Sequence, residues 1–528
     1  MPAAPAPPLQ PPDPSPGETR TLLSRTAGGA GWTIGWRAVT RALGFVSTLV
    51  LARILVPADF GLVALAISFS RAIDVLADLG VEDALVRATN AERAAYDTAF
   101  TINAIRGCVT ATVIALSAVP FAAFFEDPRL AYVVLALALA VLLDALENVG
   151  VADFRRDFAF RREFQLAIFP RLAQVAVAVT IALIWASHWA LVAGILTAAL
   201  LRTTATYLMH PFRPRLSLAA WHDLIGFSVW TWLVSMARMV RERGVVMLIG
   251  GMLNPAQLGI FTLGSEIATL PESELIGPLG RVCFASFAAV RRAGTSVSDT
   301  YLRITAATFV VALPAAIGIS AVAAPLVMLA FGAKWLEAIP IVEILAAAGI
   351  LAVTGRISAA LFNAFAILRP LFWNVIVISA LQFGLLVPLV WTWGLPGAAI
   401  ATAAVMLLEQ AVLTILAFHR FAMRPADLLR GIWRCLAATG VMAGFLALAG
   451  LGWTAAPPGF GASLRHLAVT GVLGAGAYTA VLGCLWLACG RPAGPEADGL
   501  ALAGRVASGL WHRLAGRTIL PRAGPPER

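Results

Sequence analysis

Runs of about 20 apolar residues follow one another along nearly the whole chain, separated by short stretches with proline, glycine or charge. A helix of this length crosses the ~30 Å hydrocarbon core of a bilayer. Of the 528 residues, 59% are hydrophobic and 13% are charged, whereas soluble domains carry about 25% charged residues. The chain is therefore expected to be an all-α polytopic membrane protein, and a water-soluble fold is excluded.

The breaks between these runs predict about 14 transmembrane helices. The runs lie at 30–53, 60–80, 98–124, 130–151, 165–186, 189–210, 222–249, 257–280, 302–330, 338–362, 370–392, 396–418, 432–453 and 464–489. Two runs are the least clearly delimited: the eighth, which Pro271–Glu274 interrupts, and the last. The expected count is therefore roughly 12 to 14.

Arginines gather in alternate loops, which predicts the orientation of the chain. The loop 152–164 holds four arginines, and the other even-numbered loops are also richer in arginine than the odd-numbered ones. Cytoplasmic loops carry such an excess. A proline-rich arm (1–28), expected to be disordered, and a basic tail (491–528) are thus both predicted to be cytoplasmic. The net charge of +10 favours contact with anionic membrane lipids, not with nucleic acid.

A short motif at the first break returns in the middle of the chain. Pro57 and Gly61 recur as Pro255 and Gly259 with the same spacing, and six apolar runs separate the two copies. Both copies should therefore have the same orientation in the membrane. Such parallel repeats are typical of transporters, in which the substrate path lies between the halves.

The repeat predicts the domain organisation. We expect an N-terminal lobe of six helices (29–215) and a C-terminal lobe of six helices (216–420), related by an axis along the membrane normal, around a central cavity. Two additional helices (421–490) follow them. The breaks at Pro57 and Pro255 are interpreted as turns on the extracytoplasmic side.

Ionisable residues lie inside several of the apolar runs. Each costs about 2.5 kcal/mol or more at the bilayer centre unless it has a partner or a wet cavity. They concentrate in the first two runs of each half, and the predicted cavity-lining residues that bind substrate are Arg37, Arg41, Arg71, Asp74, Asp78, Arg238, Arg241 and Glu266. Further candidates in the second half are Glu343 and Glu409.

A purely structural interpretation of these charges stays open. Arg37 and Arg41 share one helix face and could equally snorkel to lipid headgroups from the cytoplasmic end. Arg71 lies three residues before Asp74 and seven before Asp78, so an ion pair that fixes two helices would also explain the pattern.

Neither a metal site nor a catalytic centre is predicted. The five cysteines all fall in apolar runs without paired spacing, and the six histidines are scattered. There is no Walker loop. We therefore expect no cofactor.

Four segments, in three regions of the chain, resemble the bacterial polysaccharide transporter family of oligosaccharide flippases. They are LARILVPADFGLVALA (51–66), FRRDFAFRREF (154–164) with the later SHWALVAG (187–194), and FGAKWLEAIPIVEILAAAGIL (331–351). The resemblance covers roughly residues 30–420 and is nearest to exopolysaccharide exporters of the multidrug/oligosaccharidyl-lipid/polysaccharide exporter superfamily.

The resemblance implies a function and partners. A member of this family would move undecaprenyl-diphosphate-linked oligosaccharide across the inner membrane by alternating access, for exopolysaccharide or O-antigen biosynthesis. Polymerase and chain-length proteins of the same pathway would be its partners. Two alternatives remain: a drug/cation antiporter of the same superfamily, and a membrane-embedded polysaccharide polymerase or glycosyltransferase.

Overall fold

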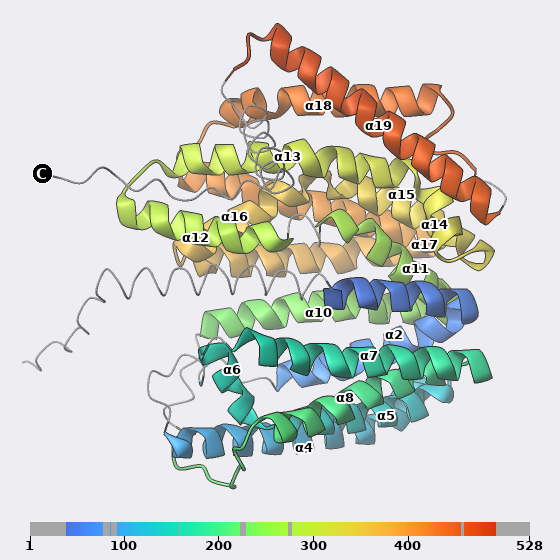
Figure 1. Ribbon diagram of the computed structural model, residues 1–528, viewed down its shortest axis with the longest axis vertical. Helices are drawn as coiled ribbons and strands as arrows, with labels where there is room; N and C mark the ends of the chain where they lie inside the picture. Colours follow the sequence, from blue (N-terminus) through green and yellow to red (C-terminus); the bar gives the residue numbers. More distant parts are fainter. Residues whose placement is uncertain are drawn as a thin grey trace, which may run out of the picture. The chain divides into compact units, whose positions relative to one another are not determined.

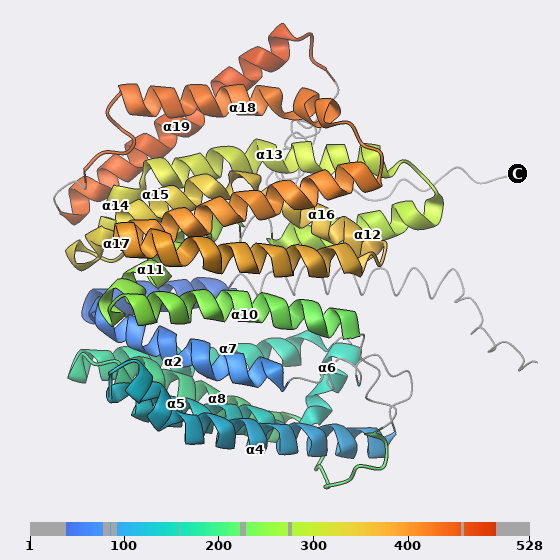
Figure 2. The same ribbon diagram turned by 180° about the vertical axis from the view of Figure 1, so that it is seen from behind.

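The computed structural model describes residues 39–77, 85, 92–157, 159–221, 229–272, 277–455 and 459–492, and every regular element in these residues is a helix (Figures 1 and 2). The proline-rich arm, nearly all of the basic tail, Arg37 and Asp78 lie outside the described residues. The chain divides into two compact units. Unit 1 comprises residues Met1–Leu55 and Ala66–Ser228, and unit 2 comprises Val56–Leu65 and Val229–Arg528.

Unit 1 is a bundle of long helices that run side by side (Figure 2). The helices α7 and α8, α4 and α5, and α5 and α8 pack against one another. Its elements are a helix at 39–54, the second part of α2 (Pro57–Leu76), α4 (Arg93–Phe124), α5 (Arg129–Ala145), η1 (Val149–Val151), α6 (Ala152–Arg156), α7 (Phe160–Trp185) and α8 (Trp189–Met209).

Tight connections join neighbouring helices of unit 1. Asp127 accepts a hydrogen bond from the Arg129 backbone N–H at 3.0 Å and pairs with the Arg129 guanidinium at 2.7 Å, which starts α5. This arginine holds the pKa of the Asp127 carboxyl below its usual value. At the turn between α7 and α8, Ala186 takes a left-handed conformation (φ 43°) and ends α7.

Unit 2 contains the first residues of α2 and the remaining helices. They are α10 (Val229–Met252), α11 (Pro255–Ala268), α12 (Gly277–Ala293), α13 (Val297–Ala321), α14 (Ala323–Ala330), η3 (Ala333–Ala338), α15 (Ile339–Ala348), η4 (Gly349–Leu351), α16 (Ala352–Ala364), α17 (Leu368–Arg420), α18 (Pro425–Leu448) and α19 (Phe460–Ala488). The helix α17 is two helices joined at Gly394, whose φ of 58° suits glycine.

Seven of the described helices are long and apolar enough to cross a membrane. They are α4, α7, α8, α13, α17, α18 and α19, and a bent pair at Ala333–Leu351 and Val353–Ala364 would make eight. The protein is thus a multi-pass membrane protein that is all-helical in its described residues. The count of 14 transmembrane helices stays a prediction. In the count of seven, α17 is one helix although it bends at Gly394, and α5, with 17 residues, is too short to be included.

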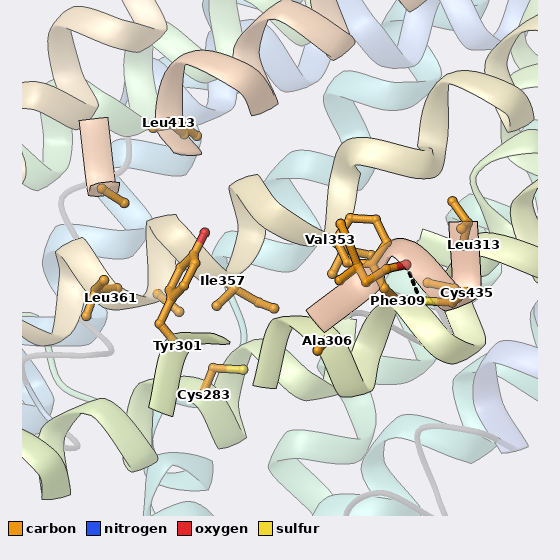
Figure 3. Close-up of a cluster of buried hydrophobic side chains, with 14 of the residues drawn as sticks. Cys283, Tyr301, Ala306, Phe309, Leu313, Val353, Ile357, Leu361, Leu413 and Cys435 are labelled. Atoms are coloured by element: carbon orange, nitrogen blue, oxygen red, sulfur yellow. Dashed lines mark hydrogen bonds between the residues drawn. The ribbon is translucent and has the colours of Figure 1, made fainter. Parts of the chain in front are cut away.

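A large apolar cluster fills the interior of unit 2 (Figure 3). Phe309 and Leu361 are almost completely buried there, together with residues from α12, α13, α16, α17 and α18. The hydroxyl of Tyr301 lies 2.9 Å from the Ser358 Oγ, so the ring is buried without leaving its polar atom unpaired. This cluster packs α12, α16 and α17, three of the helices of unit 2, against α13 and α18.

The two copies of the repeated motif contact each other at the start of α2 and the start of α11, both within unit 2. A Cβ atom added to Gly61 would overlap the Pro255 carbonyl oxygen, and one added to Gly259 would overlap the Pro57 carbonyl oxygen. The contact is therefore reciprocal and made by backbone. Only glycine lets two helices approach this closely.

Candidate functional site

Each unit contains an open cavity among its helices, lined by apolar side chains together with several charged and polar ones. The cavity of unit 1 has a volume of about 540 Å³ and lies between α2, α5, α7 and α8. The cavity of unit 2 has a volume of about 650 Å³ and lies between α10, α11, α12, α16 and α17. Both volumes fall in the range of ~300–1,000 Å³ that is usual for ligand sites.

Positive charge predominates around the unit 1 cavity. Among the described residues, its ionisable lining consists of Arg71, Arg171, Arg202 and one carboxylate, Asp144. The Arg71 side chain is 52% exposed. Ser70 also lines the cavity, and its buried Oγ has no hydrogen-bond partner in the described part of the chain. An anionic group would complete this lining.

Asp74 connects two arginines at the edge of this cavity. Its carboxylate lies 3.3 Å from Arg71 Nη1 and 3.0 Å from Arg106 Nη1. Arg71 and Asp74 lie on the same helix, α2, so the pair that links two helices is Arg106 of α4 with Asp74. A single carboxylate shared by two guanidinium groups nevertheless leaves an excess of positive charge.

The other two arginines are held by α7 and α8. Arg171 Nη1 donates to Gln174 Oε1 at 2.8 Å, and its Nη2 lies where a side chain at position 44 would be, so Gly44 makes room for it. Arg202 pairs with Glu147 at 2.6 Å. Both arginines were missed in the sequence, although each is the sole arginine within its apolar run and that isolation was the available signal.

The unit 2 cavity has a balanced charge. Arg241 Nη1 lies 2.7 Å from Glu409 Oε2, and Arg356 Nε lies 2.7 Å from Glu272 Oε1. Arg238 and Glu242, one helical turn apart on α10, also line the cavity. The described lining thus carries three arginines and three glutamates, and two of the three pairs are in direct contact.

Uncharged polar groups also line the unit 2 cavity. Gln410 is only 8% exposed, and a Cβ on Gly355 would overlap its Oε1, so the glycine provides the space for this amide. Within the described residues, Gln410 Oε1 and Ser265 Oγ are buried without a hydrogen-bond partner. The remaining amide and hydroxyl groups of the lining come from Thr269, Asn363, Gln382 and Thr402.

The structure distributes the predicted site residues over several places. Arg71 lines the unit 1 cavity, while Arg238 and Arg241 line that of unit 2. Arg41 is exposed on the helix at 39–54, and Glu266 is exposed on α11 outside the cavity lining. Of the further candidates, Glu409 lines the unit 2 cavity and Glu343 does not. Their role in substrate binding stays a prediction.

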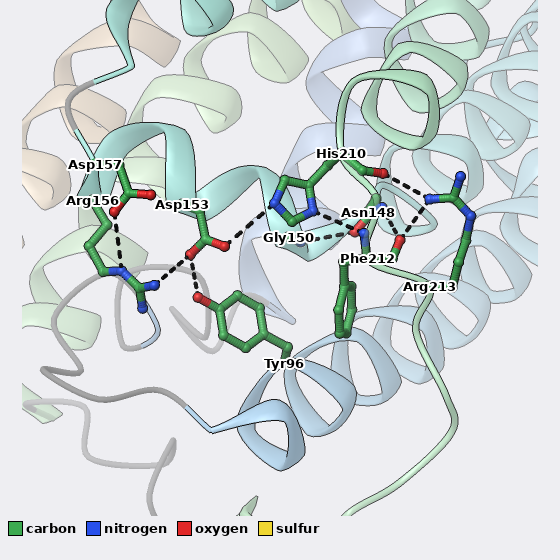
Figure 4. A network of polar contacts seen from close by, with 9 residues as sticks. All are labelled: Tyr96, Asn148, Gly150, Asp153, Arg156, Asp157, His210, Phe212 and Arg213. Atoms are coloured by element: carbon green, nitrogen blue, oxygen red, sulfur yellow. Dashed lines mark hydrogen bonds and ion pairs between the residues drawn. The ribbon is translucent and has the colours of Figure 1, made fainter.

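A polar network ties helix ends together at one end of unit 1 (Figure 4). Asp153 accepts a hydrogen bond from the Tyr96 hydroxyl and lies 3.1 Å from Arg156 Nη2 and 3.5 Å from His210 Nε2. Burial lowers the pKa of His210, and the Asp153 carboxylate opposes this effect. The network fixes α6 to the end of α8.

Asn148 extends this network. Its side chain accepts from the Gly150 backbone N–H at 2.9 Å and donates to the Phe212 carbonyl at 2.7 Å. Its backbone N–H donates to Thr206 Oγ1 at 3.0 Å. The described part of the chain contains no cluster of three or more histidine, cysteine or carboxylate side chains that could hold a metal ion.

Comparisons with known proteins give sequence relatives. A family model described as "Polysaccharide biosynthesis protein" matches residues 50–340. The chain is 26% identical to the succinoglycan biosynthesis transport protein ExoT of Rhizobium meliloti over 60% of this chain and 64% of that protein, so it spans slightly less than two thirds of ExoT. It is 23% identical to the lipopolysaccharide biosynthesis protein WzxC of Escherichia coli over 75% of this chain and 81% of that one.

Solved structures with the same fold are also found. The lipid II flippase MurJ, in an inward closed conformation, superposes with a TM-score of 0.71 at 12% identity, covering 87% of this chain and 99% of MurJ. An inward-facing multidrug resistance transporter of the MATE family, from the MOP superfamily, gives a TM-score of 0.57 at 15% identity, covering 72% of this chain and 94% of that one. These likenesses show that the chain shares the fold of these two structures.

Proposed function

Because the chain belongs to the polysaccharide biosynthesis protein family, we propose that it is a transporter, not an enzyme, that flips oligosaccharide linked to undecaprenyl diphosphate across the bacterial inner membrane. This transfer would supply repeat units for exopolysaccharide or O-antigen biosynthesis. The name of ExoT, a biosynthesis transport protein, supports a transport function. Polymerase and chain-length proteins of the same pathway are the proposed partners.

The arginine-rich cavity of unit 1 is the observation that carries this proposal. A diphosphate that crosses the bilayer must exchange its hydration for protein groups, or it pays a large desolvation cost. Arg71, Arg171 and Arg202 offer planar forks that pair with phosphate oxygens and stay charged at every physiological pH. We place the diphosphate among these three side chains.

Movement of the predicted lobes 29–215 and 216–420 would open the substrate path to one side of the membrane at a time. In this scheme both termini are cytoplasmic, so substrate enters from the side of the arginine-rich loops. The arginines of the first predicted run, Arg37 and Arg41, would receive the diphosphate on this side, and Asp78 and Glu266 would contribute to the same path.

The charge of the unit 1 cavity also weighs against the alternatives. A drug/cation antiporter would need a lining with excess negative charge, whereas three arginines face one aspartate here. A polymerase or glycosyltransferase would need groups that activate a sugar hydroxyl. The family and the named relatives are associated with biosynthesis, and ExoT specifically with transport.

Reconstitution in liposomes tests the proposed function. The purified full-length chain is mixed into vesicles that contain undecaprenyl diphosphate carrying a fluorescently labelled oligosaccharide, and external dithionite bleaches the label in the outer leaflet. We expect bleaching of nearly all the label, because the protein brings inner-leaflet substrate outward. Bleaching that stops at the level of protein-free vesicles would refute the proposal, and ion-driven uptake of organic cations or extension of the glycan would establish an alternative.

A further inference from the structure

The cavity of unit 2 differs from that of unit 1 in its charge. Two of the three arginines that line the unit 2 cavity form ion pairs with glutamates of the same lining: Arg241 with Glu409 and Arg356 with Glu272. Arg238 and Glu242 add one charge of each sign. The three glutamates of the lining repel a negatively charged ligand, whereas the unit 1 lining holds one carboxylate, so the unit 2 lining disfavours anions.

Unpaired neutral groups indicate what the cavity accepts. The carbonyl oxygen of the Gln410 amide can only accept a hydrogen bond, and the Ser265 hydroxyl can donate or accept. Both atoms are buried in the lining and have no partner in the described residues. An unsatisfied buried polar group is costly, so a ligand with hydroxyl groups would be stabilised here.

The lining also has an aromatic surface. Phe284 of α12 contacts the cavity and leaves 47% of its surface exposed. The apolar C–H face of a pyranose ring packs on such a ring while its hydroxyls reach the surrounding polar groups. Glutamates held by arginines, Asn363, Gln382 and Thr402 offer both acceptors and donors around this ring.

From these observations we propose that the unit 2 cavity binds an uncharged saccharide and discriminates against acidic sugars. The inference rests on the proposed function in one respect, that the substrate includes a glycan. The two linings would thus accept different chemical groups: phosphate at the arginines of unit 1, and neutral sugar residues in the charge-balanced lining of unit 2.

Saccharide binding can be measured separately from transport. The full-length protein in lipid nanodiscs is titrated with cellotetraose, which is neutral, and with trigalacturonic acid, which carries a carboxylate on each ring, and binding is followed by saturation-transfer NMR. We expect cellotetraose to bind at least about tenfold more tightly. Equal or tighter binding of trigalacturonic acid, or no binding of cellotetraose, would overturn the proposal.

Two variants locate the binding in this cavity. Gln410→Leu removes the unpaired acceptor and should weaken cellotetraose binding about tenfold, whereas Gln257→Leu, in the same unit but outside the lining, should leave it unchanged. Glu409→Gln releases Arg241 and should increase the affinity for trigalacturonic acid. If the variants alter neither affinity, the site is not this cavity.

The liposome assay on the same preparation separates this inference from the proposed function. Flipping without saccharide binding would overturn only the role of the unit 2 cavity. Binding of cellotetraose with charge discrimination but without flipping would refute only the transport function. The selectivity of the unmodified protein remains informative if a variant fails to fold.

Discussion

Arg241 of α10 and Glu409 of α17 form an ion pair of 2.7 Å across unit 2, with 17% and 15% of their side chains exposed. The two residues are far apart in the sequence, and the pair joins two of the helices that line the unit 2 cavity. A pair at this depth contributes to structure as well as to recognition, because removal of one partner leaves the other charge without compensation.

Removal of one member of this pair should destabilise the protein. We expect Arg241→Met to lower the free energy of unfolding by about 3 kcal/mol, since Glu409 is then left alone. The double variant Arg241→Met/Glu409→Leu should recover most of this loss. Thermal unfolding of the detergent-solubilised protein measures both. Equal losses in the single and double variants would show that the pair is not coupled.

Arg171 should be required in its guanidinium form. We expect Arg171→Lys to reduce flipping by at least about tenfold while the protein inserts normally, because an ammonium group does not offer the planar fork that pairs with phosphate. The liposome assay measures the rate. Arg465→Lys, an exposed position on α19, is the matched control and should flip at the normal rate. Unimpaired flipping by Arg171→Lys would remove this residue from the diphosphate site.

The reciprocal glycine contact should tolerate no side chain on either side. We expect Gly61→Ala and Gly259→Ala each to cost about 2 kcal/mol or more, because the added Cβ overlaps backbone that cannot rotate away. Gly318→Ala on α13, where nothing lies within 4 Å of the added Cβ, should be neutral or stabilising. Thermal unfolding compares the three variants.

The two glycine substitutions should also be less than additive. If the starts of α2 and α11 move apart once, both added methyl groups gain room. The double variant should therefore lose less free energy of unfolding than the sum of the losses in the single variants. Full additivity would contradict a shared contact.

His210 should make the stability of the protein depend on pH. Burial lowers its pKa in the folded state below the ordinary value of about 6.5. The unfolded chain therefore takes up a proton first, and the free energy of unfolding falls as the pH decreases from about 6.5 through the folded-state pKa. His210→Gln should show a smaller loss of thermal stability between pH 7.5 and pH 5.5. An unchanged pH dependence in this variant would exclude His210 as the cause.

The family resemblance and the helical fold were predictable from the sequence. The motif around Pro57 lies inside the region that the family model matches, and the resemblance is confirmed by that match. Apolar runs determine helices because backbone groups in a bilayer must be paired within the segment. The equivalence of Gly61 and Gly259 was visible as a repeat, but a repeat indicates equivalence and not contact, so their packing required the structure.

The partners of the buried charges were less predictable. The sequence does not tell which of several distant helices a side chain meets, as the pairs Asp74–Arg106 and Arg241–Glu409 illustrate. Glu266 shows the importance of helical register. Its neighbour Ser265 lines the unit 2 cavity, while Glu266 itself, rotated by about 100° on α11, is exposed.

The glycine contact has a consequence for the side-chain conformational entropy of this protein. When side chains interlock, their rotamers freeze as the surfaces meet, at a cost of up to about 2 kcal/mol for each long side chain. At Gly61 and Gly259 the facing atoms belong to the backbone of helices that are already ordered. Contact between the starts of α2 and α11 therefore freezes no side-chain rotamers at the two glycines.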